Sequence, residues 1–185
     1  MRYDTYTLFT ALLALVANGA TLALVVVFGG DRLGVGSLRR AASWLRTAFA
    51  DIGLWVVAAV AITSTIGSLL YSEYFDLIPC RWCWFQRIAM YPLALIFVIA
   101  AIRKDTAGAR RYGLPLAAIG AVMAGYHYLI QQFPNLESGA CDVSVPCSSP
   151  YVWRFEFVSI PYMALAGFLL ILAVLLATRS PSSDA

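Results

Sequence analysis

The sequence has 185 residues, of which 61% are hydrophobic and only 12% are charged. A soluble domain carries about 25% charged residues, so this composition indicates an integral membrane protein and excludes an ordinary soluble enzyme. The net charge of +3 is small and dispersed along the chain, which argues against nucleic acid as a partner. The sequence also lacks a glycine-rich phosphate loop, an HExxH motif and a paired-carboxylate motif.

Five apolar stretches are long enough to cross a bilayer, which takes about 20 residues. They cover residues 8–28, 52–71, 84–102, 112–130 and 160–178. Four of them contain no charged residue, and the third contains only Arg87. The second also has a face of small residues, Ser64, Gly67 and Ser68, that suits close helix packing. The predicted fold class is therefore an all-α integral membrane protein with five spans.

Arginine and lysine residues predict the orientation of these spans, because they are enriched in cytoplasmic loops. Residues 29–51 contain four arginines, and residues 103–111 contain three arginines and one lysine. Both connections should therefore face the cytoplasm, with the N-terminus outside and the C-terminus inside. In this topology all four cysteines lie on the extracytoplasmic face.

The stretch before the second span is expected to form a brace on the membrane. Within residues 30–51, apolar side chains recur at helical spacing and polar side chains fill the other face, which predicts an amphipathic helix on the inner membrane surface. Residues 1–29 could alternatively be a cleaved signal peptide. That interpretation is disfavoured, because Arg2 is offset by Asp4 and no small-x-small cleavage site follows the apolar run. An uncleaved anchor is preferred.

The segment "PCRWCWFQR", residues 79–87, carries the first candidate redox pair. Cys80 and Cys83 have CxxC spacing, which allows a disulfide across one helical turn. The helix is expected to begin near Pro79, and its positive N-terminal end favours a thiolate there. Arg87 follows Cys83 by one turn, and a charge inside a span marks a candidate functional site. The alternative is that Arg87 extends to the membrane surface and that the CxxC pair is only a packing feature.

The second pair, Cys141 and Cys147, occurs in "CDVSVPC" between the last two spans. A purely structural disulfide is one interpretation, because this face is oxidising. A redox role is favoured, since so small a ring contributes little stability and an exposed disulfide exchanges readily. All four cysteines could instead hold zinc, although a CxxC and a C-x5-C separated by 57 residues do not match a compact zinc site.

The electron acceptor of such a pair is expected to be a lipid-soluble quinone. The sequence contains neither a dinucleotide-binding fingerprint nor a haem-attachment CxxCH motif, whereas a quinone needs only a pocket, a thiolate and a cation or hydrogen-bond donor. Cys83 and Arg87 supply the polar groups. The aromatic residues expected around this pocket are Trp82, Trp84, Phe85 and Tyr91. His127, the only histidine, lies at a similar depth to Cys83, and a structural role and a role beside the redox pair both stay open.

At these residues the sequence resembles the DsbB/BdbC family of disulfide bond formation membrane proteins, and its BdbC branch most closely. The matching stretches are "IPCRWCWFQRIAMYPL", "YHYLIQQFP", "CDVSVPC" and "FVSIPYMALAGF", in that order within residues 50–178. The resemblance implies a protein-thiol:quinone oxidoreductase in the bacterial plasma membrane, with ubiquinone or menaquinone as cofactor. It also implies a separate partner, a thioredoxin-fold thiol oxidase similar to DsbA or BdbD.

The resemblance further implies a role for each candidate residue. Cys141 and Cys147 would take electrons from the partner. Cys80 and Cys83 would then reoxidise the loop pair and reduce the quinone, with Cys83 as the thiolate facing the quinone. The residues implied to bind quinone are Arg87, His127 and Gln86, and no metal site is implied.

Two departures from the family pattern shape the predicted organisation. The family core has four spans, so residues 1–29 would be an extra anchor and residues 30–51 an extra linker, followed by a DsbB-like bundle at 52–178 and a cytoplasmic tail at 179–185. The loop cysteines are also closer together than in the DsbB branch, so either of them could react with the partner.

Two other functions stay open at this stage. One is a membrane disulfide reductase that conducts reducing equivalents outward, which would need a cysteine facing the cytoplasm; the predicted topology provides none. The other is a membrane scaffold stapled by zinc.

Overall fold

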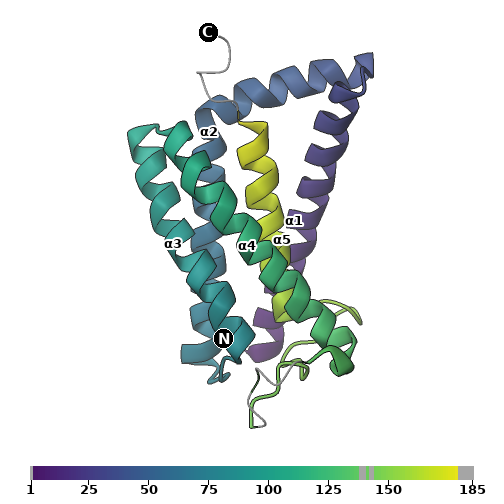
Figure 1. The fold of residues 1–185 in the computed structure, drawn as a ribbon, viewed down its shortest axis with the longest axis vertical. Helices are drawn as coiled ribbons and strands as arrows, with labels where there is room; N and C mark the ends of the chain where they lie inside the picture. Colours follow the sequence, from purple (N-terminus) through teal and green to yellow (C-terminus); the bar gives the residue numbers. More distant parts are fainter. Residues whose placement is uncertain (1, 138–140, 142–143, 179–185) are drawn as a thin grey trace.

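The protein is a bundle of long helices that run roughly along one axis (Figure 1). The computed structural model describes residues 2–137, 141 and 144–178. The helices are α1 (Tyr3–Arg32), α2 (Gly36–Leu69) continued by a π-helical turn η1 (Leu70–Tyr74), α3 (Arg81–Arg103), α4 (Thr106–Gln132), a short 3-10 turn η2 (Pro134–Leu136) and α5 (Ile160–Ala177). Five helices are long and apolar enough to cross a membrane, and each corresponds to one predicted span. The all-α, five-span prediction is confirmed; the predicted tail lies outside the described residues.

Capping residues set the ends of α3 and α4. Cys80 is the N-cap of α3, and its Sγ accepts a hydrogen bond from the Cys83 backbone N–H at 3.4 Å. Lys104 ends α3 in a left-handed conformation (φ 55°). Asp105 then caps α4, with its Oδ1 accepting from the Gly108 N–H at 2.8 Å. Because so short a turn makes α3 and α4 antiparallel neighbours, the far end of α4 returns to the level of the CxxC pair.

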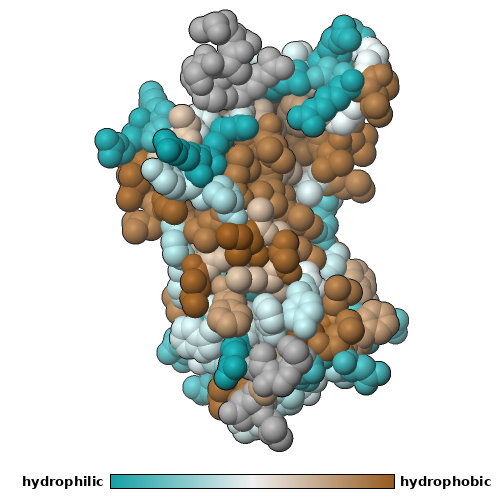
Figure 2. All heavy atoms as spheres, in the orientation of Figure 1, coloured by the Kyte–Doolittle hydropathy of each residue, from teal (hydrophilic) through white to brown (hydrophobic). Residues whose placement is uncertain are grey.

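The two ends of the bundle differ, and we name them by their contents. The cysteine end holds the starts of α1, α3 and α5 and the end of α4; the linker end holds the α1–α2 and α3–α4 connections. On the face shown in Figure 2, apolar residues form a belt across much of the middle of the bundle, and hydrophilic residues gather toward both ends. Large apolar side chains in this belt point outward, among them Val16, Ile88 and Val122, which are 69%, 63% and 74% exposed. Such a belt suits lipid as the surrounding solvent.

Helix α2 differs from the predicted organisation, because the expected linker helix and second span form one continuous helix. Its first part crosses the linker end, and the rest descends beside α3 and α5 (Figure 1). The amphipathic pattern is present: Ala42 is fully buried while Arg39 is exposed. Arg46 ties the crossing part to α1, since its Nη2 donates to Asp31 at 2.6 Å and its guanidinium lies over the Phe28 ring.

The main core lies between α2, α3, α4 and α5 and consists of aliphatic and phenylalanine side chains. Its largest fully buried members are Leu93, Phe97, Phe168, Ile171 and Leu175. Helix α4 approaches α5 closely at Gly120, where the Phe168 ring occupies the space that a Cβ would need. A side chain at this position would push the two helices apart, so glycine is required for the packing.

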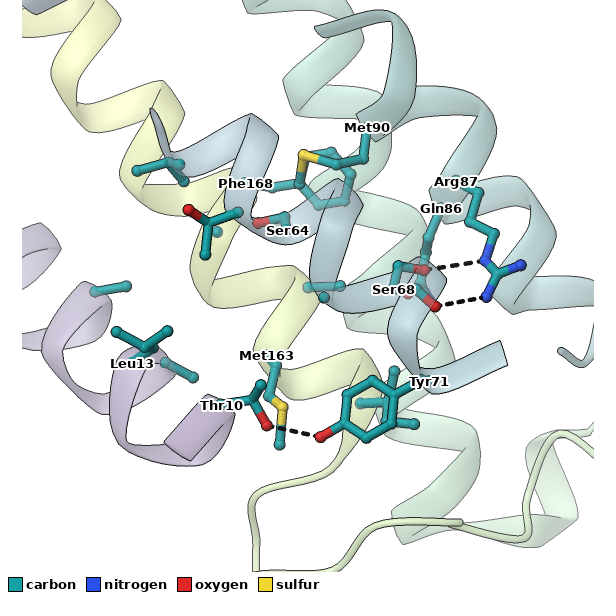
Figure 3. Close-up of a pocket in the computed structure, with 18 of the residues that line it drawn as sticks. Thr10, Leu13, Ser64, Ser68, Tyr71, Gln86, Arg87, Met90, Met163 and Phe168 are labelled. Carbon is teal, nitrogen blue, oxygen red and sulfur yellow. Dashed lines mark hydrogen bonds between the residues drawn. The ribbon is translucent and has the colours of Figure 1, made fainter. Parts of the chain in front are cut away.

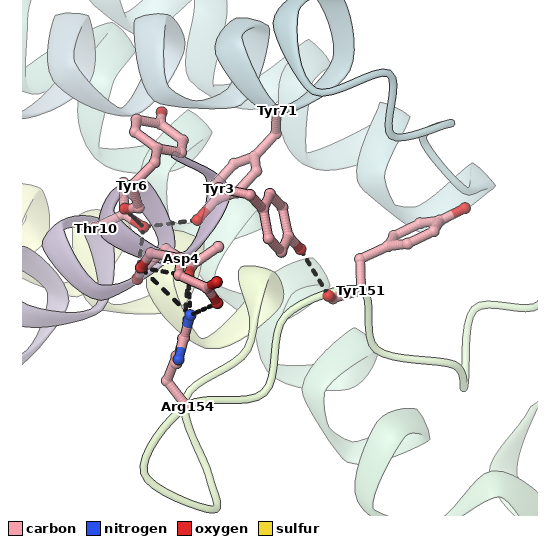
Figure 4. A network of polar contacts seen from close by, with 8 residues as sticks. Tyr3, Asp4, Tyr6, Thr10, Tyr71, Tyr151 and Arg154 are labelled. Carbon is pink, nitrogen blue, oxygen red and sulfur yellow. Dashed lines mark hydrogen bonds and ion pairs between the residues drawn. The ribbon is translucent and has the colours of Figure 1, made fainter. Parts of the chain in front are cut away.

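Helix α1 packs along α5 and α2 and is fastened at the cysteine end (Figure 4). Arg154, in the segment before α5, donates to the Asp4 carboxylate at 2.6 Å and to Thr7 Oγ1 at 2.7 Å. The Tyr3 hydroxyl donates to the Tyr151 carbonyl at 2.8 Å. On the other side the Tyr6 hydroxyl donates to the Gly67 carbonyl of α2 at 2.9 Å. The start of α1 therefore joins α2 to the loop that carries the second cysteine pair.

Candidate redox site

The CxxC pair lies at the start of α3 with both sulfurs in contact. Cys80 and Cys83 are free thiols whose Sγ atoms are 2.8 Å apart, so a disulfide between them needs little movement. Cys80 is buried and Cys83 is partly exposed. The helix start predicted near Pro79 is confirmed, since α3 begins at Arg81.

The surroundings of Cys80, the residue just before α3, favour its thiolate form. The hydrogen bond from the Cys83 thiol is the main cause that lowers the pKa of Cys80 to about 5, with a further hydrogen bond from His127, while burial opposes the change. A thiolate is the nucleophilic form of cysteine. At neutral pH the reduced pair therefore carries its negative charge at Cys80, on the side that faces the loop.

His127 joins the two cysteine pairs. It is 1% exposed, and its Nδ1 lies 2.9 Å from the Gln86 amide nitrogen. An amide nitrogen can only donate, so Nδ1 accepts and Nε2 carries the ring proton. That proton points to two acceptors, the Cys147 carbonyl oxygen at 3.2 Å and Cys80 Sγ at 3.6 Å. The imidazole is both a satisfied buried group and a neighbour of the redox pair, and Gln86 holds it in one tautomer.

The loop pair forms a disulfide between one buried and one partly exposed cysteine. Cys141 and Cys147 are bonded; Cys147 is 1% exposed, whereas Cys141 is partly exposed. The Cys147 N–H donates to Glu137 Oε1 at 2.9 Å, which fixes the inner half of the loop. Cys80 Sγ, Cys147 Sγ and a ring nitrogen of His127 all lie within 4.8 Å of one another. The buried loop cysteine is therefore the one next to the CxxC pair.

The zinc interpretation can be tested against the cluster of Cys80, His127 and Cys147. Zinc binds thiolate and neutral imidazole ligands. Cys147 is bonded to Cys141 and both ring nitrogens of His127 already have hydrogen-bond partners. With the loop disulfide formed, this cluster offers only the CxxC thiols as thiolate donors.

Arg87 lies one turn beyond Cys83 on α3 and contacts α2. It is 9% exposed, its Nε donates to Ser68 Oγ and its Nη2 donates to the Ser68 carbonyl, both at 3.0 Å. Its guanidinium lies 5.2 Å from the centre of the Trp84 ring. The side chain is thus buried and bonded to α2 instead of extending to the membrane surface. Sequence reasoning treated Ser68 only as a small packing residue, because nothing in the sequence pairs it with Arg87.

A cavity of about 380 Å³ opens beside Cys83 and Arg87 (Figure 3). Cys83, Gln86, Arg87 and Ser68 contribute polar groups to its lining, and much of the remaining wall consists of apolar side chains of α1, α2 and α5. Cys80, His127 and the loop disulfide do not line it. Cys83 therefore faces the cavity while Cys80 faces the loop.

The expected aromatic lining is wrong for most of its members. Of the four aromatic residues predicted around the pocket, Tyr91 lines the cavity and the other three do not. Trp82 packs on Tyr126 and Phe85, and Trp84 lies outside beneath Arg87. Helix α3 is apolar on all sides, so its sequence does not show which face meets the bundle interior.

Comparison with known proteins connects this site to a family. Residues 51–178 match the family model described as "Disulfide bond formation protein DsbB". The chain belongs to the DsbB family. It is 43% identical over 131 residues to disulfide bond formation protein C of Bacillus subtilis, which covers 70% of this chain and 92% of that protein. It is 48% identical over 120 residues to a probable disulfide formation protein of Oceanobacillus iheyensis, covering 64% and 80% of the two chains. No solved structure matches the chain.

Membership of the DsbB family agrees with the resemblance that the motifs indicate and makes the protein a multi-pass membrane protein of disulfide bond formation, with oxidoreductase activity. The matched region includes α3, α4, α5 and most of α2, but it excludes α1 and the crossing part of α2 before residue 51. The DsbB family is generally quinone-linked. The cavity suits such a ligand, because its volume lies within the usual range for ligand pockets, about 300–1,000 Å³, and its largely apolar lining includes the cation of Arg87.

Proposed function

We propose that the protein oxidises an extracytoplasmic thioredoxin-fold thiol oxidase and passes the electrons through its two cysteine pairs to a membrane quinone. One observation carries this proposal. Cys80 Sγ lies within 4.8 Å of Cys147 Sγ on one side, and its CxxC partner Cys83 lines an apolar cavity with Arg87 on the other. The four sulfurs thus lead from the exposed loop to the membrane interior.

The first exchange would occur at Cys141, the more exposed sulfur of the loop disulfide. A thiolate of the partner attacks Cys141 Sγ, and Cys147 leaves as a thiolate. The second thiol of the partner then attacks the mixed disulfide and releases Cys141. The partner ends as a disulfide, and the loop pair ends as a dithiol that has gained two electrons and two protons.

The second exchange would join Cys147 to an oxidised CxxC pair. The Cys147 thiolate attacks Cys80 Sγ, and Cys83 leaves as a thiolate. Cys141 then attacks Cys147, which re-forms the loop disulfide and releases Cys80. The N–H of His127 favours this exchange, because it holds the Cys147 backbone and donates toward the Cys80 thiolate.

The last transfer would use the cavity side of Cys83. A quinone bound in the cavity supplies an acceptor for two electrons and two protons. Arg87 places a fixed positive charge one turn from Cys83, and its bonds to Ser68 keep the guanidinium beside the cavity. Gln86 contributes a polar side chain to the cavity wall and orients His127 from the same position.

The proposal includes an orientation and a division of the chain. The cysteine end faces the extracytoplasmic side, because the arginine-rich connections lie at the other end. Residues 52–178 form the catalytic bundle, residues 1–29 an anchor and residues 30–51 a linker on the cytoplasmic surface, with residues 179–185 also cytoplasmic.

Cys147→Ser tests the electron route. This variant should accumulate a mixed disulfide between Cys141 and an oxidised thioredoxin-fold partner, because the free Cys141 thiol attacks the partner's disulfide, one partner cysteine leaves as a thiolate, and no second loop thiol remains to resolve the bond. Non-reducing electrophoresis and peptide mass spectrometry identify the bond, and Cys141→Ser is the matched control. A trap with Cys141→Ser alone would reverse the two roles, whereas no trap with either variant and normal turnover would refute the relay.

The zinc scaffold predicts a different composition of the purified protein. A scaffold would contain stoichiometric zinc and reduced loop cysteines, whereas the proposed oxidase contains the Cys141–Cys147 disulfide and reduces one quinone per partner dithiol oxidised. Elemental analysis and thiol counting on one preparation separate the two.

A further inference from the structure

The helix outside the family match forms one wall of the cavity. Six residues of α1 line it, and four of these are alanine or threonine: Thr10, Leu13, Ala14, Val16, Ala17 and Ala20. Opposite them lie small residues of α2, including Ala59, Thr63 and Gly67. Two helices that meet through small side chains could pack tightly, yet here they leave a space that continues to Cys83 and Arg87. The cavity therefore includes a part that the four matched helices alone do not enclose.

The cavity opens sideways between α1 and α2. Its exposed lining residues within the spans all belong to these two helices, and Val16 of α1 is 69% exposed. The helices are joined on the cysteine side of this opening, where Thr10 Oγ1 and the Tyr71 hydroxyl share a hydrogen bond of 2.6 Å (Figure 3). On the linker side, the crossing part of α2 separates them (Figure 1). The opening lies at the level of the apolar belt, so its exposed residues would face lipid.

The chemistry of the walls fits one kind of occupant. At the α3 side the cavity presents a cation and polar groups. At the α1 side it presents methyl groups and backbone, with Thr10 already hydrogen-bonded to Tyr71. A molecule with a polar ring and a long hydrocarbon tail matches both ends at once.

We propose that α1 and α2 form a lateral portal for the isoprenoid tail of the quinone, with the quinone ring at the Arg87 end of the cavity. This inference rests on the proposed function and assigns a role to α1. Helix α1 then acts as a binding wall that raises affinity for tailed quinones and leaves the cysteine chemistry to the other helices.

Filling the portal tests the proposal in the full-length protein in lipid nanodiscs. Ala17→Trp places a large side chain in the cavity, and Ala23→Trp is the matched control, since Ala23 lies on the same helix, is exposed and does not line the cavity. The measurement is the rise in Tm with menadione, which has no tail, and menaquinone-4, which has one, together with a tailless and a tailed benzoquinone. Binding is thus read without turnover.

The expected result is a selective loss. Ala17→Trp should lower affinity for the tailed quinones about tenfold, equivalent to about 1.4 kcal/mol, while the tailless quinones change little and Ala23→Trp matches wild type. If Ala17→Trp itself lowers the Tm of the ligand-free protein, Ala17→Leu decides, with a smaller loss in the same direction.

Three other results would overturn the portal. Equal affinities of Ala17→Trp and Ala23→Trp for tailed quinones would show that α1 is not part of the site. Equal losses for tailed and tailless quinones would show that the wall contacts the ring, or that a lipid chain occupies the portal. No Tm rise of the wild type with any of the four quinones would refute the proposed function itself.

Discussion

His127 is the residue on which the geometry of the site depends. Its Nε2–H faces the Cys147 carbonyl and Cys80 Sγ, and its Nδ1 accepts from Gln86. The sequence shows that the histidine and the CxxC pair share a depth in the membrane, but His127 and its partners come from three separate segments, the start of α3, the end of α4 and the cysteine loop, and their contacts depend on helix rotation. A histidine that is fully hydrogen-bonded and also central to the site combines the two roles that the sequence leaves open.

The Cys80 thiolate gives the reduced protein a specific pH dependence. The pKa of Cys80 in the folded protein is about 5, whereas the pKa of a cysteine in an unfolded chain is about 8.5. The stability that the thiolate contributes is therefore fully present above about pH 8.5, declines as the pH falls and is lost below about 5. Thiolate ultraviolet absorbance of the protein with its loop disulfide intact should show a transition near pH 5.

Two variants control this titration. Cys80→Ser should abolish the low-pH transition, and His127→Ala should move it to higher pH, because the imidazole N–H that favours the thiolate is gone. A wild-type protein whose first thiol titrates above pH 7 would contradict the assignment.

Arg87 is expected to contribute to quinone binding. Arg87→Gln removes the charge and one of the two bonds to Ser68, and it should raise the apparent KM for quinone about tenfold, or about 1.4 kcal/mol. Arg87→Lys keeps the charge but loses the planar guanidinium, so its effect should be smaller. Quinone titration of turnover measures both, and the Tm of each variant checks the fold. An unchanged KM in Arg87→Gln would leave the arginine a purely structural tie between α2 and α3.

At the scale of elements, hydropathy predicts which segments are helices but not how they are joined or turned. The linker helix and second span look like separate elements because the pattern changes from amphipathic to fully apolar near residue 51. No proline separates them, however, so the backbone stays helical throughout. The faces of α3 were misassigned because apolar residues surround it. The start of α3 near Pro79 was predicted correctly, with Cys80 as its cap. Helix α4 begins at Thr106, six residues before the predicted span at 112–130, because Asp105 caps it there.

The contact between α1 and the segment before α5 predicts a local effect of Arg154. Its ion pair with Asp4 is largely exposed, and such pairs contribute about 0–1 kcal/mol. Arg154→Ala should therefore change the Tm little. It should speed hydrogen–deuterium exchange in residues 3–10 and 151–158, because the Thr7 hydroxyl and the Asp4 carboxylate lose their shared donor.

Arg39→Ala is the matched control for this experiment. Arg39 is an exposed arginine at the linker end, 3.9 Å from Asp31, and its loss should leave exchange at the cysteine end unchanged. Equal exchange in Arg154→Ala and wild type would show that α1 holds its position without this contact.

At the scale of the whole molecule, the proposed orientation can be measured directly. Thr5, Ser37 and Ala107 are exposed residues at or near the ends of different helices, and each can be changed to cysteine in a chain without native cysteines. An impermeant thiol reagent applied to intact cells should label Thr5→Cys but neither of the other two. Labelling of Ser37→Cys with protection of Thr5→Cys would show that the orientation in the membrane is the reverse of the proposed one.

The short distance between Cys80 Sγ and Cys147 Sγ bears on how fast electrons can cross the protein. Forming a bond of about 2.05 Å from a separation within 4.8 Å is within the reach of cysteine χ1 rotation. The Cys147 backbone can stay on His127 and Glu137 meanwhile. A side-chain rotation needs no movement of the loop, whose motions extend to microseconds. Transfer between the two pairs should therefore be limited by thiol chemistry, and the slow step of a turnover should be the arrival or departure of the partner or the quinone.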